Sequence, residues 1–447
     1  MLAEGTITAP ALLEVYLDRI ARLDPALRCY RVVLAESARR EAEAAQGRLD
    51  AGERLPLLGV PVAIKDDVDV AGELTPYRSS AVSTPASRDA EVVSTLRSAG
   101  AVIIGKTSVP ELMMLPYTES LTFGATRNPW DTAVTPGGSS GGSGAAVAAG
   151  LAPLALGSDG GGSIRIPSGW CGLFGIKPQR DRVALAPHHD AWCGLSVSGP
   201  IARSVKDAAL FLDVTTTTPG PDGGFVGAAG REPGQLRIAL STKVPPPLVV
   251  NLGKEQRAAV GQAGALLRDL GHDVISRDPD YPPAAIYANY LPRYFRGIYN
   301  DVRSLPHQDR LEKRTRNMAR IGSLLSDRRM ATVRAGESGL AARIQSIFDD
   351  VDVVITPGNA TGPSRIGAYQ RRGAVSSLLL VSRRVPFFEI WNLTGQPAVA
   401  VPWGLDRGGI PLSIQLVGRP HDEATLLALS AQIEAARPWA HRRPPVS

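Results

Sequence analysis

Two glycine clusters that carry serines are the residues of this chain best suited to chemistry. The first, 137–143, reads GGSSGGS, and the second, 160–163, reads GGGS. Glycine allows positive φ angles and lets other atoms approach the main chain closely. Consecutive N–H groups turned inward form a concavity that holds an anion. Because Ser163 directly follows three glycines, its hydroxyl would lie beside such donors, and acyl transfer needs this pairing of a nucleophile with an oxyanion hole.

Phosphate binding and a flexible linker are the alternative interpretations of these glycines. A P-loop ends in Gly-Lys-Ser/Thr, and no lysine directly follows either cluster. Neither cluster fits the dinucleotide fingerprint convincingly. A Gly/Ser linker is disfavoured because residues 145–156 are apolar and Ile164-Arg165-Ile166-Pro167 follows the second cluster at once.

Lys65 ends a short apolar run at 57–64 that is typical of a buried strand. Such a lysine can reach out to solvent along the surface. It can also be desolvated, which lowers its pKa and lets the neutral amine accept a proton. From the residues alone, both interpretations stay open.

Three motifs together resemble the amidase signature family. They are G-V-P-x-x-x-K-D at 59–66, GGSSGGS at 137–143 and DGGGSIRIPS at 159–168, and 24 positions separate Ser139 from Ser163 as in that family. The resemblance covers nearly the whole chain. It implies an α/β fold in which helices cover both faces of a central mixed, twisted β-sheet.

The resemblance also implies a mechanism without a metal or organic cofactor. Ser163 would be the nucleophile, Ser139 the bridging serine and Lys65 the base, with a cis peptide bond between Gly138 and Ser139. An amide would be hydrolysed to a carboxylate and ammonia or an amine through an acyl-enzyme.

The loop around Ser163 supplies the remaining expected groups. The N–H groups of Gly160, Gly161 and Gly162 would form the oxyanion hole. Asp159 and Arg165 flank this loop, and we expect them to hold it by ionic hydrogen bonds.

Other residues compete for these roles with weaker support. Lys106, in a G-K-T sequence at a strand end, is a second candidate base, although an ordinary structural lysine fits there too. Cys171 lies in an apolar context that favours a packing thiol. His188-His189-Asp190 invites a metal site or a serine–histidine triad, but no further histidine lies nearby to complete a zinc site.

The substrate is suggested only by apolar residues. Met113, Met114, Trp170 and Trp391 favour an apolar or aromatic acyl group, and plain core packing is an equal alternative for the methionines. The main rival function is the glutamine-hydrolysing subunit of a tRNA-dependent amidotransferase, which the apolar 113–116 segment disfavours. A third possibility is an inactive scaffold, which would not need all three catalytic residues.

Composition limits the remaining classes. A net charge of +6 over 447 residues is no nucleic-acid signature. Three cysteines indicate a reducing compartment, and with no signal peptide or apolar span we expect a cytoplasmic enzyme that acts on a small-molecule amide without nucleic acid or membrane partners. Homodimers are common in the family that the chain resembles, so the resemblance implies a homodimer as an expected partner state.

The chain shows no interdomain linker, so we expect one domain, 1–447, with its signature core at about 57–205. Residues 89–105 form a βαβ-like unit, which predicts an α/β fold. Residues 281–311 lack a clear period and could cap the active site as part of 281–350, with Tyr287, Tyr290, Tyr294 and Tyr299 available for stacking. Other elements are expected as follows: helices at 8–23, 31–48, 140–150, 207–214, 254–270 and 422–436, strands at 153–157, 236–240, 273–276, 351–356, 397–402 and 411–416, and a long loop at 215–232.

Overall fold

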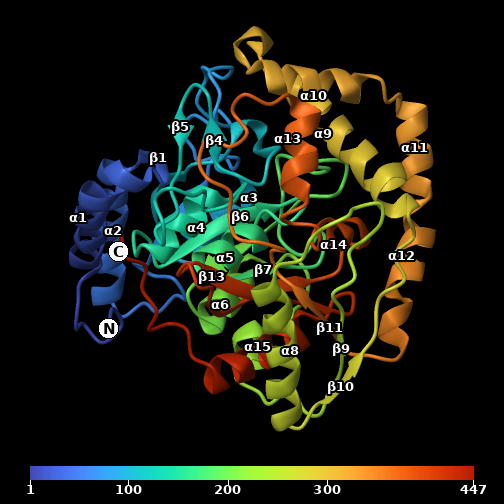
Figure 1. Ribbon diagram of the computed structural model, residues 1–447. Coiled ribbons are helices and arrows are strands. Elements are labelled where there is room, and N and C mark those ends of the chain that lie inside the picture. Colours follow the sequence, from blue (N-terminus) through green and yellow to red (C-terminus); the bar gives the residue numbers. More distant parts are fainter.

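A computed structural model describes all residues, 1–447 (Figure 1). Its main sheet has eleven strands in the order β1-β3-β2-β6-β8-β7-β12-β13-β11-β9-β10, with parallel and antiparallel pairs. The strands are β1 Tyr30–Val33, β2 Pro61–Lys65, β3 Val102–Thr107, β6 Leu154–Asp159, β7 Phe174–Lys177, β8 Val197–Ala202, β9 Arg237–Leu240, β10 Asp273–Ser276, β11 Val353–Pro357, β12 Ala398–Leu405 and β13 Pro411–Gly418. A separate pair joins β4 Glu119–Ser120 to β5 Gly124–Ala125. The expected mixed sheet is confirmed.

Helices pack on both faces of this sheet. They are α1 Ala9–Leu27, α2 Ala35–Asp50, α3 Glu91–Ser98, α4 Gly141–Ala148, α5 Arg165–Cys171, α6 Val205–Thr215, α7 Gly224–Ala229, α8 Lys254–Asp269, α9 Leu291–Ser304, α10 Lys313–Ser323, α11 Asp327–Ala335, α12 Glu337–Gln345, α13 Ala374–Ser382, α14 Glu389–Thr394 and α15 Glu423–Ala436. In Figure 1, α1 and α2 lie on the side of the molecule opposite to α11 and α12. None of the helices is long and apolar enough to cross a membrane.

Side-chain alternation along β2 decides where Lys65 points. Val62 and Ile64 belong to the core cluster that also contains residues of α3 and α6, whereas Ala63 belongs to the cluster built with α4. Since successive side chains of a strand point to opposite faces, Lys65 lies on the α4 side with Ala63. β2 runs parallel to both β3 and β6, so the carboxyl ends of these three strands meet at one edge of the sheet.

Three expectations for local structure were wrong. The segment 31–48 is not one helix, because residues 30–33 form β1, which pairs with β3, and only then does α2 begin. The loop at 215–232 contains α7, whose first turn is capped by the Asp213 carboxylate, accepting from the N–H groups of Phe225 at 2.6 Å and Val226 at 3.0 Å. Both departures depend on partners outside the segment concerned.

The third error concerns residues 281–311, which are largely helical. A short π-helix, Ala285–Tyr290, leads directly into α9. Tyr294, Ile298 and Val302 are buried at four-residue spacing on α9, so the helical period is present. This period was missed in the sequence because a charged residue, Arg293, also lies on the buried side of the helix, where it pairs with Glu337.

Candidate active site

Lys65 lies at the carboxyl end of β2, and its side chain is fully buried. Its Nζ donates hydrogen bonds to Ser139 Oγ at 2.8 Å, Ser158 Oγ at 2.7 Å and the Ser158 carbonyl at 3.3 Å. Burial lowers the pKa of Lys65 below its usual value, and the carboxylates of Asp67 and Asp159 only partly offset this effect. The buried, and not the solvent-exposed, interpretation of this lysine is therefore the right one.

Ser139 is brought to Lys65 by the turn that precedes α4. The peptide bond between Gly138 and Ser139 is cis, as the family resemblance implied. A Cβ atom at Gly138 would lie 2.8 Å from the Tyr117 backbone nitrogen, so no larger residue fits there. The next residue, Ser140, donates its N–H to the Ser163 carbonyl at 3.2 Å, which ties this turn to the second serine cluster.

Ser158 and Asp67 complete the surroundings of Lys65, and sequence reasoning missed both. Ser158 Oγ donates to Asp67 Oδ2 at 2.5 Å, and Asp67 Oδ2 lies 3.4 Å from Lys65 Nζ. Hydrogen bonds thus run from Asp67 through Ser158 and Lys65 to Ser139. The available signal was positional: Asp67 follows Lys65 by two residues, and Ser158 lies on the neighbouring parallel strand β6.

The glycine loop at 160–163 is held by Asp159. The Asp159 carboxylate accepts from the N–H groups of Gly162 at 2.6 Å and Ile164 at 3.1 Å. The backbone N–H groups of Gly160, Gly161 and Ser163 donate to no protein acceptor. The N–H group of Gly162 is therefore not available as an oxyanion donor, contrary to expectation. The N–H group of Ser163 is available instead, together with those of Gly160 and Gly161.

Arg165 holds Asp159 in turn, and both side chains are fully buried. The guanidinium donates to the Asp159 carboxylate at 2.9 and 3.0 Å, and also to Gln415 and Asn392, each at 2.7 Å. Burial opposes ionisation of Asp159, yet the charge and hydrogen bonds of Arg165, with a hydrogen bond from Asn392, bring its pKa well below the usual value. The ionic hydrogen bonds expected of Asp159 and Arg165 are present. Asn392 and Gln415, distant in sequence, were not foreseen.

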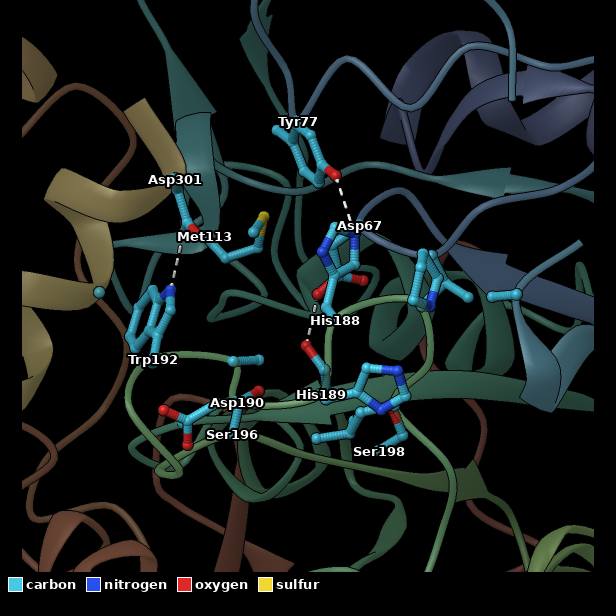
Figure 2. A pocket seen from close by; sticks show the side chains of 18 of the residues that line it. Asp67, Tyr77, Met113, His188, His189, Asp190, Trp192, Ser196, Ser198 and Asp301 are labelled. Atoms are coloured by element: carbon cyan, nitrogen blue, oxygen red, sulfur yellow. Dashed lines mark hydrogen bonds between the residues drawn. The ribbon is translucent and has the colours of Figure 1, made fainter. Parts of the chain in front are cut away.

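Ser163 lies where two cavities meet, because both cavities are lined by Met113, Ser163 and Trp192. We call the first the polar cavity; Figure 2 shows part of its lining, including Asp67, His188 and Asp301. The second, the apolar cavity, is lined mainly by aliphatic and aromatic side chains from 113–116, 286–294 and 378–385. Ser139 and Ser158 line only the polar cavity, whereas Gly161 lines only the apolar one.

The expected substrate-binding residues divide between cavity and core. Met113 lines both cavities and Met114 lines the apolar one. The expectation for Trp391 was wrong: it is fully buried outside both cavities and packs edge-on against Tyr281. Trp170 is buried in a small cluster with Ile166, Val385 and Phe388. A tryptophan near a site in sequence is also a common core residue, and only packing distinguishes the two.

The tyrosines of 281–311 divide in the same way. Tyr290 and Tyr294 line the apolar cavity, whereas Tyr287 is exposed. The Tyr290 hydroxyl donates to the Gly160 carbonyl at 3.2 Å. A Cβ atom at Gly161 would lie 2.1 Å from that hydroxyl, so the close approach of Tyr290 requires glycine there. The segment forms a wall of the site, while a lid motion stays a prediction.

The competing candidate residues have other surroundings. Lys106 Nζ pairs with buried Asp66 at 3.2 Å and lines neither cavity. Burial raises the pKa of the Cys171 thiol, which contacts the Pro136 carbonyl and also lines neither cavity. His188, His189 and Asp190 do line the polar cavity, where Tyr77 Oη contacts His188 Nε2 at 3.3 Å (Figure 2). The structure contains no group of three or more His, Cys, Asp or Glu placed to hold a metal ion.

Known proteins resemble this chain over its full length. The amidase family model matches residues 11–427. AmiB2 of Mycobacterium tuberculosis, provisionally assigned as an amidase, is 73% identical over 100% of this chain and 96% of its own length. A glutamyl-tRNA(Gln) amidotransferase subunit of Roseiflexus castenholzii is 35% identical over 100% of this chain and 96% of its own length. The solved structure of 6-aminohexanoate cyclic dimer hydrolase is 30% identical, with a TM-score of 0.89 covering 100% of this chain and 97% of that one.

A family match across most of the chain, together with a solved amidase among its structural neighbours, agrees with the motifs and with the fold. The inactive scaffold is thereby set aside. This protein belongs to the amidase signature family and is an amide-hydrolysing enzyme.

Proposed function

We propose that this enzyme hydrolyses carboxylic amides by a Ser163–Ser139–Lys65 mechanism through an acyl-enzyme. The observation that carries the proposal is the line of hydrogen bonds from Asp67 through Ser158 and Lys65 to Ser139, which ends at the cavity that Ser163 also lines. A nucleophilic serine needs an adjacent base, and the base needs a group that orients it. In this proposal Ser139 connects the base Lys65 to the nucleophile Ser163, and Ser158 orients Lys65.

The proton moves along the same line. Neutral Lys65 accepts a proton from Ser139 Oγ while Ser139 accepts one from Ser163 Oγ, which attacks the amide carbon. Burial of Lys65 supports this step, since a lowered pKa makes the neutral amine available. The leaving nitrogen then takes a proton back through Ser139 as the C–N bond breaks. Water repeats the sequence on the acyl-enzyme and releases the carboxylate.

The oxyanion is held by backbone donors in this proposal. Gly160, Gly161 and Ser163 have N–H groups without a protein acceptor, whereas Gly162 supports the loop through Asp159. Loss of one oxyanion donor costs roughly 3 kcal/mol of transition-state stabilisation. Fixing the loop by a buried ion pair keeps the donors in place before the charge develops.

The two cavities define the direction of the substrate. Ser139 must reach the leaving nitrogen, and Ser139 lines only the polar cavity, so the amine side extends there. The acyl group extends into the apolar cavity, which Met113, Met114, Tyr290 and Tyr294 help to line. Apolar walls favour an apolar or aromatic acyl group.

Glutamine hydrolysis is the second candidate, favoured by the likeness to an amidotransferase subunit. Glutamine carries an α-carboxylate that a site must neutralise or hydrogen-bond. No lysine or arginine is among the residues that line either cavity. This favours the apolar amide over glutamine.

The test is ammonia or amine release from a panel of aliphatic, aromatic and charged amides, including glutamine, by wild type and by Ser163→Ala. We expect turnover of apolar or aromatic amides by wild type and a loss of at least about 10³-fold in Ser163→Ala. Equal turnover by both proteins would contradict the serine mechanism. Preference for glutamine would support the second candidate.

A further inference from the structure

The polar cavity is acidic although the protein as a whole is basic. The net charge of the chain is +6, yet four aspartates and no lysine or arginine line this cavity. One of the four, Asp190, pairs with Arg334 at 3.4 Å. The other three are Asp67, Asp69 and Asp301. Asp67 lies 3.4 Å from Lys65 Nζ, which the proposed mechanism uses as a neutral amine, and neither Asp69 nor Asp301 pairs with a cationic side chain.

One of the two carboxylate oxygens of Asp67 has no hydrogen-bond partner. Its side chain is only 9% exposed, and Oδ1 forms no hydrogen bond, whereas Oδ2 accepts from Ser158. A buried carboxylate oxygen without a partner is costly. Asp67 lines the polar cavity together with Ser139 and Ser158.

Asp69 and Asp301 also line the polar cavity. Asp69 forms no ion pair and no side-chain hydrogen bond within the protein, and Asp301 accepts only from Trp192 Nε1, at 3.0 Å (Figure 2). Burial, with a further contribution from the charge of Asp67, raises the pKa of Asp301 to about 6. A cation in the cavity near Asp67 and Asp301 would offset this repulsion.

We infer that the amide substrate carries a positively charged amino group on its leaving-amine side, which binds in the polar cavity that Asp67, Asp69 and Asp301 line. The inference rests on the proposed function, because the leaving side is assigned from the role of Ser139. It deepens that function by naming the substrate class: mono-amides of aliphatic diamines with an apolar acyl group. Hydrolysis adds water across the C–N bond and yields the carboxylate and the free diamine.

Three amides that share a hexanoyl group test this inference. N-(4-aminobutyl)hexanamide is cationic, N-pentylhexanamide is its neutral counterpart of equal length, and N-(3-carboxypropyl)hexanamide is anionic. We expect kcat/KM for hexanoate release at pH 8 to be at least about tenfold higher for the cationic than for the neutral amide, and lowest for the anionic one. Equal values for the cationic and neutral amides would overturn the inference.

Charge-removing variants locate the selectivity. Asp69→Asn and Asp301→Asn should each reduce the cationic-to-neutral ratio by about threefold or more. Asn at position 301 can still accept from Trp192, so the change removes charge and keeps this hydrogen bond. Asp269→Asn, which is exposed on α8 and lines neither cavity, removes one negative charge elsewhere and should leave the ratio unchanged. A ratio lowered equally by Asp269→Asn would contradict a local site.

A binding measurement separates this inference from the proposed function. Calorimetric titration of the Ser163→Ala protein with the cationic and neutral amides reports recognition without turnover. Tighter binding of the cationic amide supports the acidic site even if wild type hydrolyses neither compound. Equal or weaker binding overturns it, whatever the activity. Turnover that persists in Ser163→Ala would contradict the proposed mechanism alone.

Discussion

β2 and β3 are parallel neighbours, and each buries one lysine completely. On β2, Lys65 Nζ contacts the hydroxyls of Ser139 and Ser158, and both serines line the polar cavity with Ser163. On β3, Lys106 Nζ contacts the Asp66 carboxylate at 3.2 Å and Thr75 Oγ1 at 2.6 Å, and Arg31 also pairs with that carboxylate.

Burial alone does not distinguish these two regions. Desolvation lowers the pKa of Lys65 and of Lys106 alike, and a nearby carboxylate partly offsets it in both. They differ in what each amine can reach: Lys65 reaches a hydroxyl at a cavity, whereas Lys106 reaches only groups that stay inside the protein. A perturbed lysine is therefore a candidate base only where a proton donor for the reaction lies against it.

The largest expected difference comes from removing each amine. Lys65→Met should lower kcat/KM by about 10³-fold or more, because the base is lost. Lys106→Met should leave kcat/KM of the folded enzyme within about threefold and cost about 3 kcal/mol of unfolding free energy, since Asp66 loses a buried cation. Steady-state kinetics and urea unfolding measure the two effects. A larger activity loss in Lys106→Met would reverse the comparison.

Removing a hydroxyl partner from each lysine gives two matched substitutions, and we expect smaller effects than from removing the amines. Ser158→Ala removes the hydroxyl between Lys65 and Asp67, and we expect kcat to fall by about 10- to 100-fold. Thr75→Val removes the corresponding hydroxyl of Lys106 and should cost only about 1 kcal/mol of stability, with activity retained. If Ser158→Ala keeps full activity, Ser158 does not orient the base.

The pH profile gives the smallest effect and sharpens the comparison further. Activity requires neutral Lys65, so kcat/KM should fall as the pH decreases through its pKa. The charge of Asp67 raises that pKa against the effect of burial, so Asp67→Asn should lower it further and move the acid limb to lower pH. Asp66→Asn, next to Lys106, should leave the limb in place. A shift of equal size in both variants would show that the limb does not report Lys65.

The sequence predicted much of the fold where the signal was local. β12 and β13 pair around the Gly408-Gly409 turn as expected, and α8, β9 and β10 lie close to the expected bounds. The errors at β1 and α7 have a different origin, because a neighbouring strand and the carboxylate of Asp213 decide those structures. Such partners leave no periodic pattern in the segment itself.

The residues of the candidate site also differ in whether a local sequence signal could identify them. Lys65, Ser139 and Ser163 belong to contiguous motifs, so the sequence could indicate them together. Asn392 and Asp301 reach the site from distant helices, and only the folded chain brings them there. Trp391, beside Asn392, shows the converse, because its side chain points into the core.

The covalent intermediate tests the central proposal most directly. Wild type would be mixed with an apolar amide, quenched in acid within milliseconds and examined by intact and peptide mass spectrometry. We expect a mass increase equal to the acyl group, located on Ser163, and no such species in Lys65→Met. Acylation of Cys171 or of another residue, or full turnover by Ser163→Ala, would contradict the account.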